Sequence, residues 1–113
     1  MYHWVDEVPL SRAKRNIARD FSDGVLVAEV IKHFMPKEVD LHNYSAAHSA
    51  QQKIYNWNTL NAKVLKKMGL KLSKKEIEDV VNMVPDAIEL TMARLKIRMD
   101  QILTQKQAVR MSA

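Results

Sequence analysis

The sequence contains no cysteine, so it can form neither a disulfide framework nor a thiolate metal site. It contains only two glycines and three prolines among 113 residues, and a chain with so few breakers favours helices. No apolar run is long enough to span a bilayer. The opening residues lack the basic-then-apolar order of a signal peptide. We therefore expect a helical protein of the reducing cytoplasm.

The length and composition predict one globular domain. Hydrophobic residues make up 47% and charged residues 27% of the chain, and both values are near the average for folded domains. A chain of this length can bury one core without disulfides or metals. We predict a single domain over residues 1–103. A fraying C-terminal helix extension or tail is expected over residues 104–113, because the apolar pattern thins after Leu103.

Apolar spacing and helix-terminal residues predict an all-α domain of four main helices with shorter connecting helices. Ser22 or Asp23 can cap a helix whose run Val25–Phe34 is apolar almost all round, which is typical of a buried central helix. A second helix is predicted over residues 50–68, where six apolar residues share one stripe and Gly69 provides the stop. The stripe consists of Ile54, Trp57, Leu60, Val64, Leu65 and Met68.

Two further helices are predicted in the C-terminal half of the chain. Ser73 and Glu76 form a capping-box pattern that starts a short helix, and this helix ends near Pro85. The last helix begins near Asp86 and carries an apolar seam spaced by four and three residues. We favour packing of this seam on the domain core over a coiled coil, because it covers few heptads. The seam consists of Ile88, Met92, Leu95, Met99 and Ile102.

The N-terminal part and the connection between the first two main helices are less regular. A short helix is expected over residues 2–7, with Trp4 as its buried anchor. An irregular basic stretch over residues 10–20 follows it. Residues 36–49 are predicted to form a long connection that has room for one helical turn.

No group of residues predicts catalysis, so we expect no enzyme activity, no cofactor and no metal site. The two glycines are isolated, which excludes a glycine-rich phosphate loop. His3, His33, His42 and His48 lack metal-ligand spacing. His42 and His48 could meet in space, but a solvated loop explains them better. No serine lies in a motif that marks a nucleophile.

The layout of charge is the main functional feature of the sequence. The net charge is +5 and the pI is about 9.6, a balance that favours an acidic partner. One basic group precedes the central helix, and a second lies in a stretch without acids between Asp40 and Glu76. We predict that both groups contribute to one binding surface, in which arginine forks suit carboxylates. The candidate residues are Arg12, Lys14, Arg15, Arg19, Lys63, Lys66 and Lys67.

The basic groups are also compatible with roles that do not involve an acidic protein partner. Lysines on the back of an amphipathic helix usually form a solvated face. Arg19, the strongest single candidate, could instead pair with a carboxylate of the domain such as that of Asp23. A basic nucleic-acid-binding helical domain and a membrane-surface module are two alternatives. We expect neither nucleic acid nor membrane as a partner, because no nucleic-acid-binding signature is visible and the apolar helix faces are committed to the core.

The segments Trp4–Arg12 and Lys14–Ile31 resemble the calponin-homology domains of the microtubule-associated, sperm-flagellar type. The most specific part is the run Arg-Asp-Phe-Ser-Asp-Gly joined to Val-Leu-Val-Ala-Glu. The resemblance extends from about Tyr2 to Arg98, nearly the whole chain. It departs at Ala13, where the pattern of the family has proline.

This resemblance implies a calponin-homology fold and binding to microtubules, that is, to tubulin, in the cytoskeleton of cilia and flagella, including the axoneme. It also implies a contribution to microtubule stabilisation or bundling. Such domains precede a C-terminal coiled coil that forms dimers, so we expect the isolated domain to be monomeric and the full-length protein to be dimeric. An actin-binding calponin-homology module is a further alternative, although actin-binding modules typically act as tandem pairs.

Overall fold

The described part of the chain folds into helices joined by turns and, over residues 35–49, by the long connection with one helical turn that the sequence predicts. The structure is a computed structural model that describes residues 3–11 and 16–112, and the side chains of residues 4–11 and 16–108. No strand occurs within these ranges. The elements are α1 His3–Asp6, α2 Ile17–Asp20, α3 Val25–Phe34, the 3-10 turn η1 Leu41–Asn43, α4 Ala50–Leu60, the π-helix η2 Asn61–Leu65, α5 Lys74–Val81 and α6 Ala87–Ser112.

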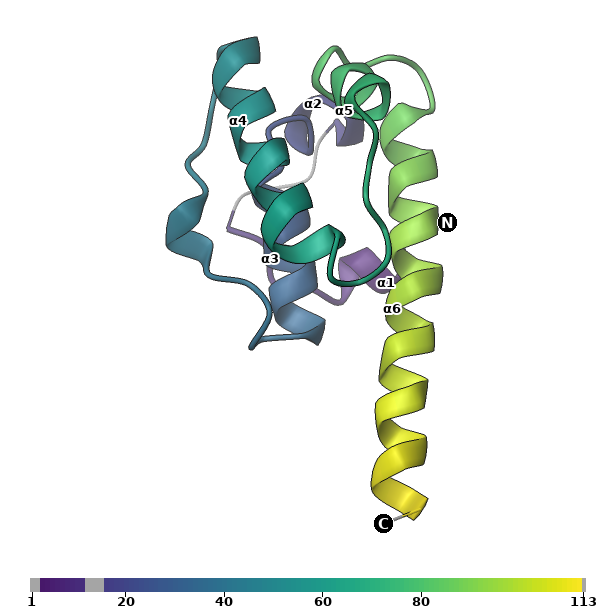
Figure 1. The fold of residues 1–113 in the computed structure, drawn as a ribbon. Helices are drawn as coiled ribbons and strands as arrows, with labels where there is room; N and C mark the ends of the chain where they lie inside the picture. The colour runs from purple at the N-terminus through teal and green to yellow at the C-terminus, as the bar shows by residue number, and fades with distance from the viewer. Residues whose placement is uncertain (1–2, 12–15, 113) are drawn as a thin grey trace.

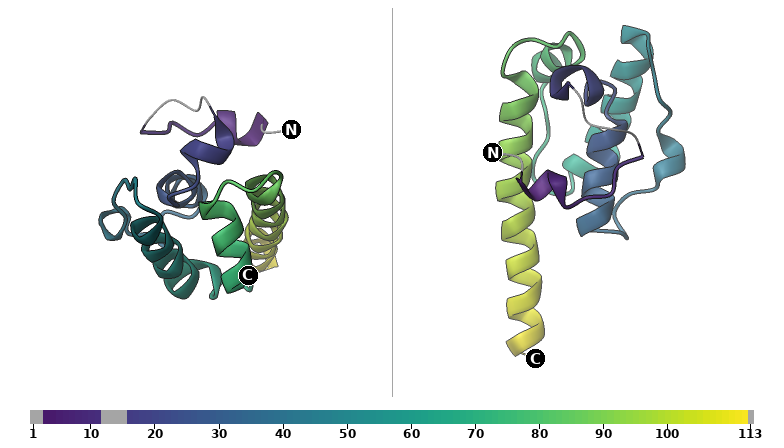
Figure 2. Two further views of the ribbon diagram at one scale, coloured as in Figure 1. Left: turned by 90° about the horizontal axis from the view of Figure 1, so that it is seen from above. Right: turned by 180° about the vertical axis from the view of Figure 1, so that it is seen from behind.

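Helix α3 forms the centre of the molecule, as its apolar run predicts. α1 and α2 lie on one side of it, α4 and η2 lie on the other, and α5 and α6 close the bundle (Figures 1 and 2). The predicted bounds of this helix are confirmed. Its side chains therefore contact helices in several directions, which explains why it has little polar surface. The buried side chains are Leu26, Val27, Ala28, Val30 and Ile31.

The helix predicted over residues 50–68 is divided into two parts. α4 ends at Leu60, and η2 continues the same path with a wider turn, in which the Lys66 N–H donates to the Asn61 carbonyl at 2.9 Å. Gly69 then reverses the chain with a φ of +74°, which confirms the predicted stop. The apolar stripe packs as predicted: Trp57, Leu60, Val64, Leu65 and Met68 are buried, and Ile54 is half-buried against the core.

The two C-terminal helices begin and pack as predicted. The Ser73 hydroxyl accepts from the Glu76 N–H at 3.1 Å, and the Glu76 carboxylate accepts from the Ser73 N–H at 2.9 Å. This reciprocal pair is the predicted capping box. The apolar seam of α6 contacts the domain core, which confirms core packing for this helix: Ile88, Met92, Leu95 and Met99 are buried, and Ile102 is half-buried.

One short helix lies within the stretch predicted to be irregular. α2 is a single turn, and the Asn16 side chain caps it by accepting from the Arg19 N–H at 3.1 Å. A single turn is too short to produce an apolar period, so the sequence pattern could not reveal it. In α1, Trp4 is half-buried, with its ring centroid 6.1 Å from that of Phe34.

Helix α6 extends beyond the body of the molecule (Figure 1). The principal extents are 48 × 26 × 26 Å, and the long dimension follows from this projecting helix. Residues 104–108 are exposed, although they remain helical. The domain boundary at residue 103 stays a prediction. Within the described residues, no helix has the length and hydropathy needed to cross a membrane.

Candidate basic binding surfaces

The lysines of η2 and of the turn after it face solvent. Val64 and Leu65 anchor this segment to the core, and the residues beside them point outward as a result. In the part of the chain that the structure describes, none of the outward lysines forms an ion pair. Their charges are therefore available to an external partner. We call this set the lysine surface: Lys63, Lys66, Lys67 and Lys71.

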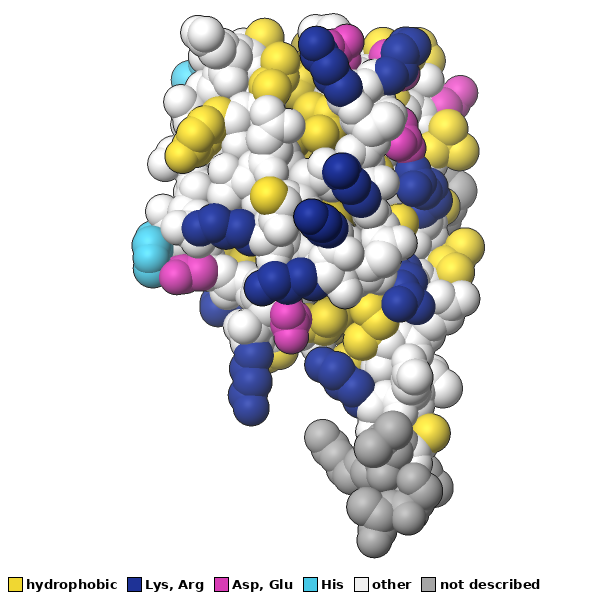
Figure 3. Space-filling view, viewed as in Figure 1, with side chains coloured by type: hydrophobic (Ala, Val, Ile, Leu, Met, Phe, Trp, Pro, Cys, Tyr) yellow, Lys and Arg dark blue, Asp and Glu magenta, His cyan; other side chains and the backbone are white. Residues whose placement is uncertain are grey.

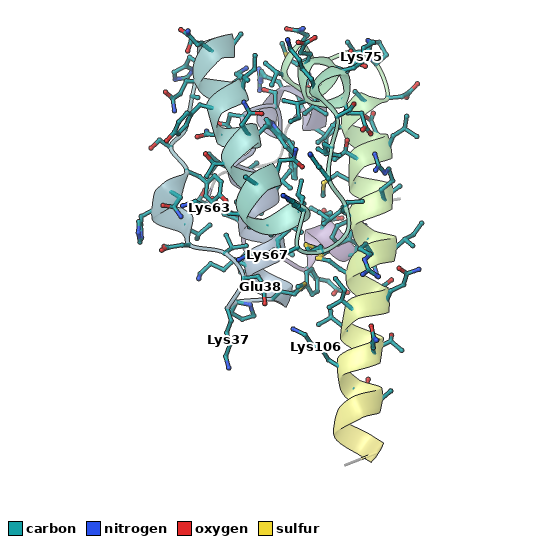
Figure 4. All side chains as sticks on the ribbon, viewed as in Figure 1. Lys37, Glu38, Lys63, Lys67, Lys75 and Lys106 are labelled. Atoms are coloured by element: carbon teal, nitrogen blue, oxygen red, sulfur yellow. The ribbon has the colours of Figure 1, made fainter. Side chains whose placement is uncertain are left out.

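Further basic side chains lie on the same face as the lysine surface. Figure 3 shows lysine and arginine side chains spread over the face that α4, η2, α5 and α6 present, with few acids between them. Figure 4 places Lys37 and Lys106 on this face, along with the acid Glu38. Both lysines are exposed. Neither lysine was among the sequence-based candidates. Lys37 is followed by the acid Glu38, and Lys106 lies where the apolar pattern of the last helix thins.

Two lysines of the acid-free stretch are already engaged within the domain. Lys75 bonds Asp79 at 2.8 Å, one helical turn away, and this hydrogen bond raises the pKa of Lys75. Lys53 donates to the Ser22 hydroxyl at 2.9 Å. The lysine surface therefore differs from Lys53 and Lys75 in having no such partner among the described residues.

Arg19 lies on α2 and is mostly exposed. Its guanidinium Nε lies 3.4 Å from the Asp20 carboxylate, and 63% of its side chain is accessible. An ion pair this exposed contributes little to stability. The carboxylate of Asp23, which we considered as a structural partner of Arg19, accepts instead from the N–H groups of Val25 and Ala47 at 3.0 and 3.2 Å.

The backbone that carries Arg19 is held by side chains from α4. The Ser22 hydroxyl donates to the Arg19 carbonyl at 2.8 Å, and Lys53 in turn donates to this hydroxyl. The indole N–H of Trp57 donates to the Ser22 carbonyl at 2.8 Å. The sequence did not reveal this role of Lys53. The only local hint is that a basic residue lies one helical turn before a buried tryptophan.

Arg19, which belongs to the N-terminal basic group, does not lie beside the lysine surface in the structure. α2 and η2 lie on opposite sides of α3 (Figure 2), so Arg19 is not brought together with the lysine surface. For Arg19 this arrangement differs from the predicted shared patch, whereas for Arg12, Lys14 and Arg15, which lie outside the described residues, the shared patch stays a prediction. The physical reason is that the buried α3 separates the two elements, and spacing along the sequence carries no information about this separation.

Three more candidates, Arg12, Lys14 and Arg15, lie outside the described residues. The residue before them is well fixed: the Ser11 N–H donates to the Glu29 carboxylate at 2.8 Å, and its hydroxyl donates to the same carboxylate at 2.6 Å. Ser11 is thus tied to α3. The Ser11 hydroxyl thus donates its proton to Glu29, and both residues line an open pocket of about 410 Å³ together with His33.

No metal-binding arrangement is found in the described ranges, where no three His, Asp or Glu side chains gather into a possible site. His42 bonds Asp40 at 2.6 Å in an exposed loop, and His48 is exposed as well. The predicted absence of a metal and a cofactor stays a prediction.

The central α3, the helices on either side of it and the capped α5 place the chain in the all-α calponin-homology-like class. Residues 1–97 match the family model described as "CH-like domain in sperm protein", and the chain belongs to this family. It is 48% identical over 101 residues to proteins named "Sperm flagellar protein 1" from Homo sapiens, Bos taurus and Xenopus laevis. The match covers 89% of this chain but only 43–44% of each relative, so the chain spans less than half their length.

Proposed function

We propose that this domain binds microtubules and has no catalytic activity. The single observation that carries the proposal is the lysine surface, four exposed cations that lack carboxylate partners among the described residues. An acidic protein surface complements such a face and steers its approach. Membership of the CH-like family supports a cytoskeleton-associated, structural role. The name of the relatives supports a place in the flagellum, and by extension in cilia and their axonemes.

The proposed contacts are of two kinds. Lys63, Lys66 and Lys67 form the main docking face, and Arg19 with the sequence neighbours Arg12, Lys14 and Arg15 forms a second one. We propose that the domain alone is a monomer, and that stabilisation or bundling of microtubules needs the rest of a dimeric full-length protein. A micromolar affinity, about −8 kcal/mol, is expected for a single module of this kind.

The test is co-sedimentation with microtubules at several salt concentrations. The triple variant K63E/K66E/K67E is expected to bind roughly 100-fold more weakly, because three attractions become repulsions. Binding of the natural chain should fall as salt rises, because exposed charges are screened over about 8 Å at physiological ionic strength. Tail-cleaved microtubules then show whether the acidic tubulin tails take part.

Single variants separate the two surfaces. If Arg19 also contacts the microtubule, R19E should abolish pelleting while the helical circular-dichroism signal stays intact. Lys75→Glu is the control for the lysine surface, since Lys75 is also exposed but already bonds Asp79; it should pellet nearly as well as the natural chain. If the triple variant and R19E both pellet normally, microtubule binding through these charges is refuted.

Two alternatives have direct tests of their own. Pelleting with actin filaments but not with microtubules would assign the domain to the actin-binding class. A gel shift with nucleic acid that microtubules fail to compete away would favour nucleic-acid binding. The lysine surface by itself is compatible with either partner, whereas the family match favours the cytoskeleton.

A further inference from the structure

One side chain closes the segment that carries the lysine surface. Asn61 is the first residue of η2, and its amide donates to the Leu72 carbonyl at 2.9 Å. The same amide accepts from the Leu72 N–H at 2.8 Å. Both polar groups of one side chain thus bind the backbone of a single residue eleven positions later. Residues 61–72 therefore form a closed loop.

The interior of this loop is held as well. The guanidinium of Arg98, from α6, donates to the Met68 carbonyl. Within the loop, the Leu70 N–H donates to the Leu65 carbonyl at 2.8 Å. Leu65, Met68, Leu70 and Leu72 are all buried. The backbone is thereby fixed at its ends and at its turn, while the side chains between the buried positions point to solvent.

The loop carries charge of one sign only. Lys63, Lys66, Lys67 and Lys71 are exposed, and the sequence from residue 61 to residue 72 contains no acid. Like charges repel, so an unbraced segment of this composition would tend to open and spread its lysines. Asn61 opposes that tendency without adding a charge of its own.

We propose that residues 61–72 are a preorganised docking loop for a carboxylate-rich protein surface, and that Asn61 is its positioning residue. Asn61 would set the affinity without touching the partner. The physical reason is that a loop held in its bound shape loses less conformational freedom on binding. This inference rests on the proposed function, because the carboxylate-rich surface tested is that of microtubules.

The test compares Asn61→Ala with Asn58→Ala. Asn58 is an exposed asparagine one turn earlier, and no side-chain hydrogen bond is found for it in the described residues. N61A should bind microtubules about fivefold more weakly and N58A as the natural chain does. The slope of affinity against salt should be unchanged in N61A, because all four ammonium groups remain. Lys71→Ala should reduce that slope.

Hydrogen exchange shows whether the loop has opened. The Leu72 amide should exchange faster in N61A, because its acceptor is gone. If the Leu72 amide exchanges faster in N61A but this variant binds microtubules with the affinity of the natural chain, the proposal is overturned while the microtubule function stands. A K63E/K66E/K67E variant that binds normally overturns the microtubule function, and the inference with it.

A second pair of variants covers the case in which N61A fails to fold. Asn61→Asp keeps an acceptor for the Leu72 N–H but loses the donor to its carbonyl, and Asn58→Asp adds the same charge without touching the loop. N61D is expected to bind more weakly than N58D. Equal binding by these two variants overturns the proposal.

Discussion

Gly24 and Trp57 together fix the entrance to the central helix. Gly24 has a φ of +82°, a conformation that non-glycine residues rarely adopt. A Cβ at this position would lie 3.5 Å from the Trp57 ring, which is an ordinary contact. A larger residue at position 24 would therefore be strained by its backbone conformation and not by a clash of its Cβ with the Trp57 ring. The turn also carries the Ser22 carbonyl that accepts from the Trp57 indole.

Gly24→Ala should lower the free energy of unfolding by about 1–2 kcal/mol, the usual penalty for an L-residue in the left-handed region. Urea unfolding followed by circular dichroism measures the change. Gly24→Asn serves as the control, because asparagine tolerates this conformation better and should cost less. An alanine variant as stable as the natural chain would show that the turn can relax.

Helix α5 depends on its capping box, and the box makes its stability sensitive to acid. The hydrogen bond from the Ser73 N–H, helped by the nearby Arg94, lowers the pKa of Glu76 from its ordinary value of 4.5. Because this pKa is lower in the folded state, the ionised carboxylate stabilises the fold above pH 4.5. That contribution is lost as the pH falls through the lowered value.

Ser73→Ala should cost about 1 kcal/mol near neutral pH, as loss of an N-cap hydroxyl usually does. Glu76→Gln should make stability less dependent on pH in the acid range, because the titrating carboxylate is gone. Denaturant unfolding at pH values from about 3 to 6 tests both. If the stability of E76Q depends on pH in the acid range as that of the natural chain does, a group other than Glu76 causes this dependence.

Element boundaries show where pattern reasoning was sufficient and where it was not. The bounds of α3 and the start of α5 could be predicted, because a continuous apolar run and a capping box are local signals. The π-helical turn of η2 could not, because its wider turn keeps the same residues buried as a regular helix would. The pairing of Asn61 with Leu72 was also invisible, since it depends on how the chain reverses at Gly69.

At the scale of the whole molecule, the projecting end of α6 adds length but little burial. Removal of residues 104–113 should change the free energy of unfolding by no more than about 0.5 kcal/mol, because residues 104–108 are exposed. A shorter chain that ends at Arg98 is the control. It loses the buried Met99 and should be destabilised by about 2–5 kcal/mol. Thermal unfolding measures the stability of both truncated chains. A large loss of stability in the chain that ends at residue 103 would refute the boundary there.

The sequence by itself determined the helical class, the buried helix faces, the capping box of α5 and the run of lysines without acids, because each of these follows from residues close together in the chain. Only the tertiary structure decided that α3 separates Arg19 from the lysine surface. It also decided that Lys53 supports the Arg19 turn and that Asn61 closes the lysine loop. These are contacts between residues far apart in the sequence, and the packing of helices that brings such residues together leaves no local pattern.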